Sequence, residues 1–149
     1  MIDYFEKSVS MSSYLVAYVI SDFKSVKKLS DKYQIEVEVA GRPEPIENGD
    51  GDFALNQAAQ ILDFFTDYFE VKYPLKKSTQ IAIPDFNSGA MENWGLSEFM
   101  IKKLFTLKTL ILGRSICSLL YKLFRFMYLI QFNRNKIFTI KSSKITYSY

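Results

Sequence analysis

Two short stretches near the start of the chain have the hydrophobic patterns of β-strands. Residues 14–20 (YLVAYVI) form a continuous run of aliphatic and aromatic side chains, which is typical of a strand buried on both faces. Residues 34–39 alternate strictly between polar and aliphatic side chains, which predicts an antiparallel strand with one face on a core and its glutamates in water. Residues 24–32, between them, are polar and basic. We therefore expect a connection there and pairing between the two strands.

A period of three to four residues then predicts a helix over residues 53–71. Residues 41–51, rich in glycine and proline, are the expected linker before it. Asp52 is the expected N-cap, and the Tyr73-Pro74 pair ends the helix because proline disfavours helical geometry in the residue before it. The apolar stripe is broad enough to need burial against other elements. It consists of Leu55, Ala58, Ala59, Ile61, Leu62, Phe64, Phe65, Tyr68 and Phe69.

A further strand is predicted over residues 79–83 (TQIAI), and Pro84 stops it. A loop of small residues follows, in which Gly89 and Ala90 would let a ligand approach the backbone closely. An exposed strand edge binds extended peptides through main-chain hydrogen bonds, and a partly desolvated Glu92 would attract a cation such as a free amine. The alternative interpretation is an ordinary surface turn with a solvated Glu92.

Composition excludes several kinds of active site. The 149 residues include no histidine, which excludes Ser-His-Asp and Cys-His nucleophile systems and histidine-ligated zinc. The single cysteine, Cys117, excludes an internal disulfide framework and a CxxC site. The first seven residues (MIDYFEK) do not have the pattern of a secretory signal.

Charge divides the chain near residue 100. All 16 acidic residues and nine basic residues lie in residues 1–100, whereas residues 101–149 contain ten basic residues and no acidic one. An asymmetry of this size indicates two unlike segments. No uncharged span long enough for a membrane helix occurs in the basic segment, because lysines and arginines interrupt its apolar part.

The sequence of the predicted loop resembles that of a known protein family. Gly89, Ala90, Met91, Glu92 and Asn93 spell GAMEN, and WGL follows, as in the zinc aminopeptidases of the aminopeptidase N family. Three other blocks are similar to successive parts of such an enzyme: SMSSYLVAYVISDF, AGRPE and ALNQAAQILDFFTDYFEVKYPL. The resemblance covers about residues 5–96. Four blocks in order are much more specific than the motif alone.

The resemblance implies an α+β fold in two family domains. Residues 1–42 would be the C-terminal part of an N-terminal β-saddle domain, and residues 43–100 would begin a thermolysin-like catalytic domain. Glu92 would bind the free α-amine of a peptide N-terminus, and the backbone of Gly89 and Ala90 would hold the peptide as an added strand. Ser88 would lie near the pocket for the first side chain. The implied substrate-binding residues are Gly89, Ala90, Met91, Glu92 and Asn93.

Departures from the family limit what this chain is expected to do. The intact family uses zinc bound by an HExxH helix and a further glutamate, but this sequence has no histidine. We therefore expect an inactive fragment with no catalytic residue and no bound zinc. The resemblance is expected to stop after Leu96, where the family has a strand ending in Arg-Glu. Intact relatives are plasma-membrane ectoenzymes or cytosolic, so the resemblance leaves the localisation of this chain open.

Residues 101–149 allow three interpretations. Their bias towards Lys, Ile, Leu, Phe, Tyr, Ser and Asn is what a translated intron or frameshift from AT-rich sequence would give. A basic and aromatic amphipathic helix would instead bind an anionic membrane surface. Ten cations with interleaved aromatic residues would also suit nucleic acid, but no recognisable motif supports this, and no nucleic-acid partner is expected.

Overall fold

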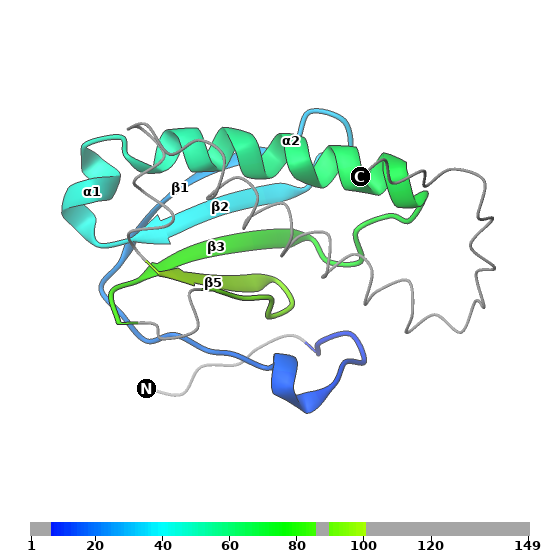
Figure 1. Cartoon of the computed structure of the whole chain (residues 1–149), viewed down its shortest axis with the longest axis horizontal. Helices are drawn as coiled ribbons and strands as arrows, with labels where there is room; N and C mark the ends of the chain where they lie inside the picture. Colours follow the sequence, from blue (N-terminus) through cyan, green and yellow to red (C-terminus); the bar gives the residue numbers. More distant parts are fainter. Residues whose placement is uncertain (1–6, 86–89, 101–149) are drawn as a thin grey trace, which may run out of the picture.

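The computed structural model describes residues 7–85 and 90–100, which form an α+β fold, as the sequence predicts (Figure 1). A five-stranded mixed sheet carries one long helix along one face. In chain order the elements are η1 (Ser13–Leu15), β1 (Lys24–Leu29), β2 (Glu36–Gly41), α1 (Pro43–Glu47), α2 (Gly51–Phe69), β3 (Lys77–Ile83), β4 (Ala90–Met91) and β5 (Leu96–Met100). The predictions for residues 1–6 and for residues 101–149 lie outside the described residues.

The strand order of the sheet is β1-β2-β3-β5-β4. β1 runs antiparallel to β2, β2 and β3 are parallel, β3 and β5 are parallel, and β4 is antiparallel to β5. Strands from both sides of residue 42 thus share one sheet, with Val39 opposite Gln80 in the parallel β2–β3 pair. The division between two family domains at residues 42/43 stays a prediction, and in this sheet it falls between paired strands.

The strand predicted over residues 34–39 corresponds to β2, and the alternation is confirmed. Ile35, Val37 and Val39 are buried, whereas Glu36 and Glu38 lie on the opposite face of the sheet and are partly exposed. The strand predicted over residues 79–83 is confirmed as β3, which begins two residues earlier than predicted. Both strands could be predicted from their apolar positions because these strands face the core directly.

The predictions for the two preceding segments are wrong. Residues 14–20 contain only the end of the 3-10 turn η1 and an irregular stretch, in which Leu15 alone is fully buried. Residues 24–29 are not a connection but β1, and it is β1 that pairs with β2. β1 is an edge strand with lysine side chains, so its sequence lacks the apolar run by which a central strand is recognised.

α2 packs over β1 and β2 and supplies much of the core. Helix formation over this segment is confirmed, but Asp50 is the residue before the helix and Asp52 lies in its first turn, so the predicted N-cap is wrong. The whole of α1 lies within the predicted linker over residues 41–51, so this linker contains a short helix. α2 ends at Phe69, and the next residue, Glu70, caps it with a left-handed backbone of φ 53°, ahead of the predicted Tyr73-Pro74 stop.

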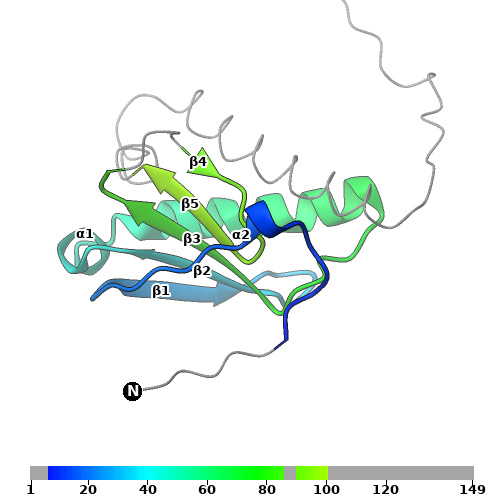
Figure 2. The same cartoon turned by 90° about the horizontal axis from the view of Figure 1, so that it is seen from below.

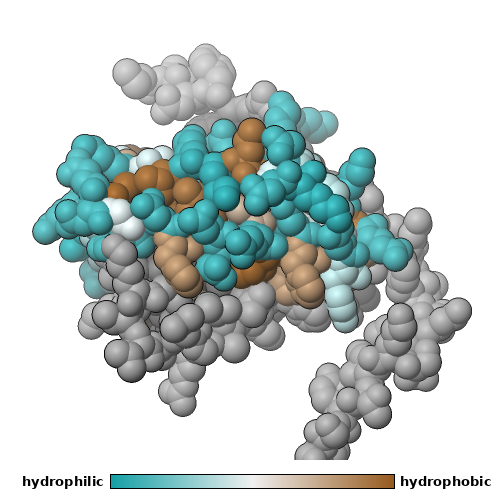
Figure 3. Space-filling model, turned by 90° about the horizontal axis from the view of Figure 1, so that it is seen from above, coloured by the Kyte–Doolittle hydropathy of each residue, from teal (hydrophilic) through white to brown (hydrophobic). Residues whose placement is uncertain are grey.

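The apolar stripe of α2 is narrower than predicted. Leu55, Ala58, Leu62 and Phe65 are among its buried side chains, but Phe64 and Tyr68 are 57% and 61% exposed. These two rings stack on each other on the outer side of the helix, with centroids 6.0 Å apart. The face of the molecule on the α2 side is mainly hydrophilic, with apolar patches between the polar side chains (Figure 3).

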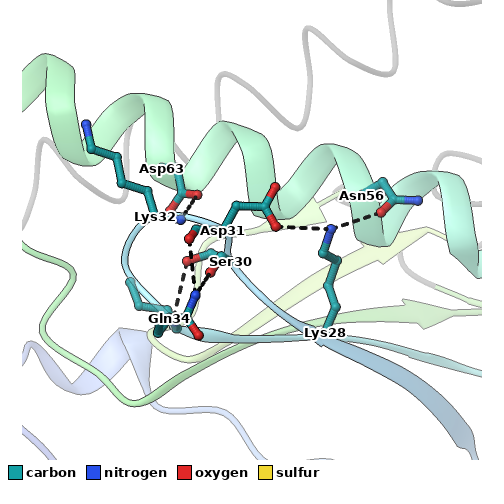
Figure 4. A network of polar contacts seen from close by, with 8 residues as sticks. Lys28, Ser30, Asp31, Lys32, Gln34, Asn56 and Asp63 are labelled. Carbon is teal, nitrogen blue, oxygen red and sulfur yellow. Dashed lines mark hydrogen bonds and ion pairs between the residues drawn. The ribbon is translucent and has the colours of Figure 1, made fainter.

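Polar contacts join the β1–β2 turn to α2 (Figure 4). The backbone N–H of Lys32 donates to Oδ2 of Asp63 at 3.0 Å, and Nζ of Lys28 donates to Oδ1 of Asn56 at 3.2 Å. Gln34 has a positive φ of 55° at the end of this turn. The contacts hold the first two strands against the helix, which fixes the half of the sheet farthest from β4.

Candidate functional site

The GAMEN segment lies at the edge of the sheet opposite β1. Ala90 and Met91 form β4, the last strand in the sheet order, and pair with Phe99 and Glu98 of β5 (Figure 2). The sequence predicted a strand edge that leads into a loop of small residues, whereas in the structure Ala90 and Met91 form a short strand of their own. Ser88 and Gly89 lie outside the described residues.

Glu92 is buried. It directly follows β4, and only 2% of its surface is exposed. The alternative interpretation of a surface turn with a solvated glutamate is therefore wrong. Burying a carboxylate is costly unless hydrogen bonds or charges compensate it, so this position restricts the groups that can lie against Glu92.

Asn93 connects the motif to the N-terminal part of the described chain. Its Nδ2 donates a hydrogen bond of 3.2 Å to the backbone carbonyl of Leu15, and both residues are buried. Asn93 Oδ1 is also buried, and no hydrogen bond reaches it from the residues that the structure describes. The two positions are 78 residues apart in sequence, so nothing in the local pattern predicts the contact.

The residues after the motif lead back into the sheet. Trp94 is partly buried and packs against the hydrophobic core. Gly95 has φ +78°, a left-handed conformation that glycine adopts without a steric penalty. The Gly95 carbonyl accepts a hydrogen bond of 2.9 Å from the N–H of Thr79, so this turn is fixed against β3 where β5 begins.

Two further carboxylates lie on the sheet face opposite α2, and sequence reasoning assigned neither of them to the site. Glu98 of β5 lies across from Met91 of β4 and Ile81 of β3. Burial raises the pKa of the Glu98 carboxyl, and no hydrogen bond or ion pair reaches it from residues 7–85 or 90–100. The sequence did hold a signal for this position: Glu98 is next to Phe99, which faces the core, so period-two alternation places Glu98 on the opposite face of β5.

Glu38 of β2 lies on the same face in the opposite electrostatic situation. Its Oε2 accepts from Oγ1 of Thr79 at 2.9 Å, and Nζ of Lys27 lies 3.4 Å from its Oε1. Burial alone would raise its pKa, but hydrogen bonds from Ser25 and Thr79, together with Lys27 and Lys77, outweigh burial and lower the pKa of Glu38 below its ordinary value.

Residues that could hold a zinc ion do not come together in this part of the protein. Within residues 7–85 and 90–100, no three side chains of His, Cys, Asp or Glu are grouped as metal ligands. The whole sequence has no histidine, so the nitrogen donors of an aminopeptidase zinc site are missing from it. The available donors therefore do not fit that site.

Over residues 7–85 and 90–100, no helix is long and apolar enough to cross a membrane.

Comparison with known proteins agrees with the motif. Residues 53–111 match the model of the peptidase family M1 domain, so the match continues beyond Leu96, where the resemblance was expected to stop. Mouse (Mus musculus) aminopeptidase N is 48% identical over 92 residues, which are 62% of this chain and 9% of that enzyme. Human (Homo sapiens) endoplasmic reticulum aminopeptidase 1 is 50% identical over 97 residues, which are 65% of this chain and 10% of that enzyme.

The chain thus spans about a tenth of the length of the curated relatives that it matches. The matched part includes α2, β3, β4 and β5. The matched part also includes residues 89–93, which spell the GAMEN motif. This chain is thus similar to the peptidase family M1 domain over residues 53–111, and to mouse aminopeptidase N over 92 of its 149 residues.

Proposed function

We propose that residues 89–93 form the peptide N-terminus recognition segment of an M1-type aminopeptidase. In this proposal the Glu92 carboxylate binds the free α-amine of a peptide. The backbone of Gly89 and Ala90 holds the peptide as an added strand at the outer edge of β4, while Met91 and Asn93 complete the segment. The observation that carries the proposal is a buried glutamate directly after an edge strand.

Physical reasons support this assignment. An edge strand offers main-chain groups to an extended peptide, and this mode of binding depends little on the peptide's side chains. A carboxylate in a water-poor position interacts more strongly with an ammonium group than one in bulk water does. Together these two features would select a chain terminus rather than an internal stretch of peptide.

The same proposal includes the absence of hydrolysis by this chain alone. Zinc aminopeptidases need three protein ligands around the metal and an open position for the water that attacks the peptide bond. The donors available here do not fit that arrangement. Recognition of the amine without an activated water binds a peptide and leaves it intact.

The test uses the only tryptophan, Trp94, which lies two residues after Glu92, as a fluorescent reporter. A short peptide with a free α-amine is titrated into the full chain alongside its N-acetylated form. We expect saturable fluorescence changes only with the free amine, and their loss in Glu92→Gln. Glu44→Gln, on the surface of α1, is the matched control and should bind normally. Equal responses to the two peptides, or normal binding by Glu92→Gln, would refute the proposal.

An alternative function is binding of an anionic membrane surface through residues 101–149. One observation favours it, namely ten basic residues and no acidic residue in that segment, together with many aromatic residues. Co-sedimentation of the full chain with phosphatidylserine vesicles distinguishes the two functions. Vesicle binding that falls steeply with salt and is lost on removal of residues 101–149 would support the alternative. The same removal should not affect the amine binding that depends on Glu92.

A further inference from the structure

Among the described residues, the ion pairs of the sheet face opposite α2 lie in its β1–β2–β3 half. Nζ of Lys27 lies 3.3 Å from a carboxylate oxygen of Glu36 and 3.4 Å from one of Glu38. Nζ of Lys77 lies 3.9 Å from Oε2 of Glu38. On the other half, Glu98 of β5 has no ion pair within residues 7–85 and 90–100. The described part of the chain therefore leaves one carboxylate of this face without a cation.

Glu98 lies between apolar neighbours, close to the GAMEN segment. Its register partners are Ile81 of β3 on one side and Met91 of β4 on the other. Glu98 and Met91 are both partly exposed, so a ligand can reach them from solvent. Burial raises the pKa of the Glu98 carboxyl, because its removal from water is not offset by a nearby cation. Apolar neighbours also screen charge less than water does, so this carboxylate attracts an arriving cation more strongly than a fully solvated one.

A peptide held at the outer edge of β4 would bring one of its side chains to the same face. Side chains of directly opposed residues in neighbouring strands lie on the same side of a sheet. The peptide residue opposite Met91 would therefore point the same way as Met91 and Glu98. Neighbouring strands are about 4.8 Å apart, so the peptide backbone would lie roughly 10 Å from β5, with β4 between them. The long apolar stem of a lysine or arginine can cross Met91 while its charged end reaches Glu98.

We propose that Glu98 is a specificity-determining residue, which selects a lysine or arginine side chain in the peptide residue opposite Met91. This inference rests on the proposed function, because Glu92 must hold the α-amine of the peptide. Met91 directly precedes Glu92, so the selected residue is the first or second of the peptide. The preferred ligand thus carries two cations close together, an α-amine at Glu92 and a basic side chain at Glu98.

The other carboxylates of this sheet face do not suit this role. Glu98 is the only acidic residue in β3, β4 and β5. Glu36 and Glu38 lie on β2, three positions from β4 in the strand order, and lysines already compensate their charges. A negatively charged side chain opposite Met91 would be repelled by Glu98, so the same geometry predicts that aspartate and glutamate are disfavoured at this peptide position.

Titration calorimetry of the full chain at low salt compares tripeptides that all have a free α-amine. Tri-alanine measures amine binding alone, and lysine or its uncharged analogue norleucine replaces alanine at position one or two. We expect one lysine peptide to bind roughly fivefold more tightly than its norleucine counterpart, and this gain to shrink with added salt. Glu98→Gln should abolish the gain and leave the affinity for tri-alanine unchanged. Glu36→Gln is the matched control and should retain the gain, because β2 lies beyond the reach of the peptide.

Glu98→Lys gives a second test that does not depend on a loss of binding. This variant should reverse the preference, so that a tripeptide with glutamate at the selected position binds more tightly than the lysine peptide. Equal binding of the lysine and norleucine peptides, a lysine preference that survives Glu98→Gln, or an equal loss of affinity for all peptides in Glu98→Gln would overturn this inference without affecting amine recognition by Glu92. Failure of every free-amine peptide to bind would instead refute the proposed function, and this inference with it.

Discussion

The amide of Asn93 donates a hydrogen bond to the carbonyl of Leu15 and so joins the GAMEN motif to the 3-10 turn η1. The contact is buried on both sides, where a hydrogen bond lost on one side leaves a polar group without water to replace it. The position of Glu92, one residue before Asn93, therefore depends on a segment that precedes it by nearly eighty residues in sequence.

Asn93→Ala should lower the free energy of unfolding by about 1–3 kcal/mol, the cost of leaving the buried Leu15 carbonyl without its donor. Amide hydrogens of Leu15 and Val16, which donate within η1, should also exchange faster. Asn56→Ala is the matched control, because Asn56 contacts Lys28 at the surface of α2. Similar stabilities and exchange rates for the two variants would mean that the Asn93 contact does not hold η1.

Gly95→Ala should destabilise the protein by about 1–2 kcal/mol because φ +78° is costly for a residue with a Cβ atom. Space alone is not limiting, since the new Cβ would meet the flexible end of Leu75 at 3.2 Å. Gly49→Ala is a matched control at φ +76° in another loop. Denaturant unfolding should show comparable losses for both variants, but only Gly95→Ala should alter the fluorescence of Trp94. Wild-type stability for Gly95→Ala would contradict the strain argument.

How far the sequence predicted the fold depended on whether each element faces the core. β2 and α2 were readable because their apolar positions recur with periods of two and of three to four residues. The run at residues 14–20 was misassigned because strand propensity describes a residue's fit to a partly buried sheet, and this run has no strand beside it in the described structure. β1 was missed for the opposite reason, because its lysines suit an exposed edge.

The role of Glu92 could be predicted only from the GAMEN sequence motif. Spacing alone favoured a solvated Glu92, whereas the resemblance to aminopeptidases indicated a binding residue, and the structure buries it. The hydrogen bond between Asn93 and Leu15 could not be predicted, because long-range contacts of this kind depend on the path of the whole chain. The different environments of Glu38 and Glu98 likewise depend on neighbours from three different strands.

Addition of zinc to the purified full chain should not produce peptidase activity. The sequence lacks the nitrogen ligands of the family site, so a bound ion would have no fixed open position from which to activate water. Metal analysis after dialysis and release of an aminoacyl reporter group give the measurement, with Cys117→Ser as a control for binding by the single thiol. Stoichiometric zinc with turnover that a chelator abolishes would contradict the expectation.

Glu98→Gln and Glu38→Gln should change stability in opposite directions at pH 7. Folding raises the pKa of Glu98 above 4.5 through burial, so its stabilising contribution is complete below 4.5 and is lost as pH rises through the folded pKa. Folding lowers the pKa of Glu38 below 4.5, so its contribution is present above 4.5 and is lost as pH falls through the folded pKa. At pH 7, Glu98→Gln therefore removes an uncompensated charge, and Glu38→Gln removes a charge that Lys27 and Lys77 stabilise.

Denaturant unfolding of both variants between pH 4 and pH 7 measures this difference. We expect Glu98→Gln to stabilise and Glu38→Gln to destabilise the protein at pH 7, each by roughly 1 kcal/mol or less because both carboxyls keep some contact with solvent. The benefit of Glu98→Gln should shrink as the pH approaches 4, because the wild-type carboxyl is then protonated in the folded protein. The penalty of Glu38→Gln should shrink more slowly, since that carboxyl keeps its charge to lower pH. If both variants changed the free energy of unfolding at pH 7 in the same direction, Glu38 and Glu98 would not have the opposite electrostatic environments described above.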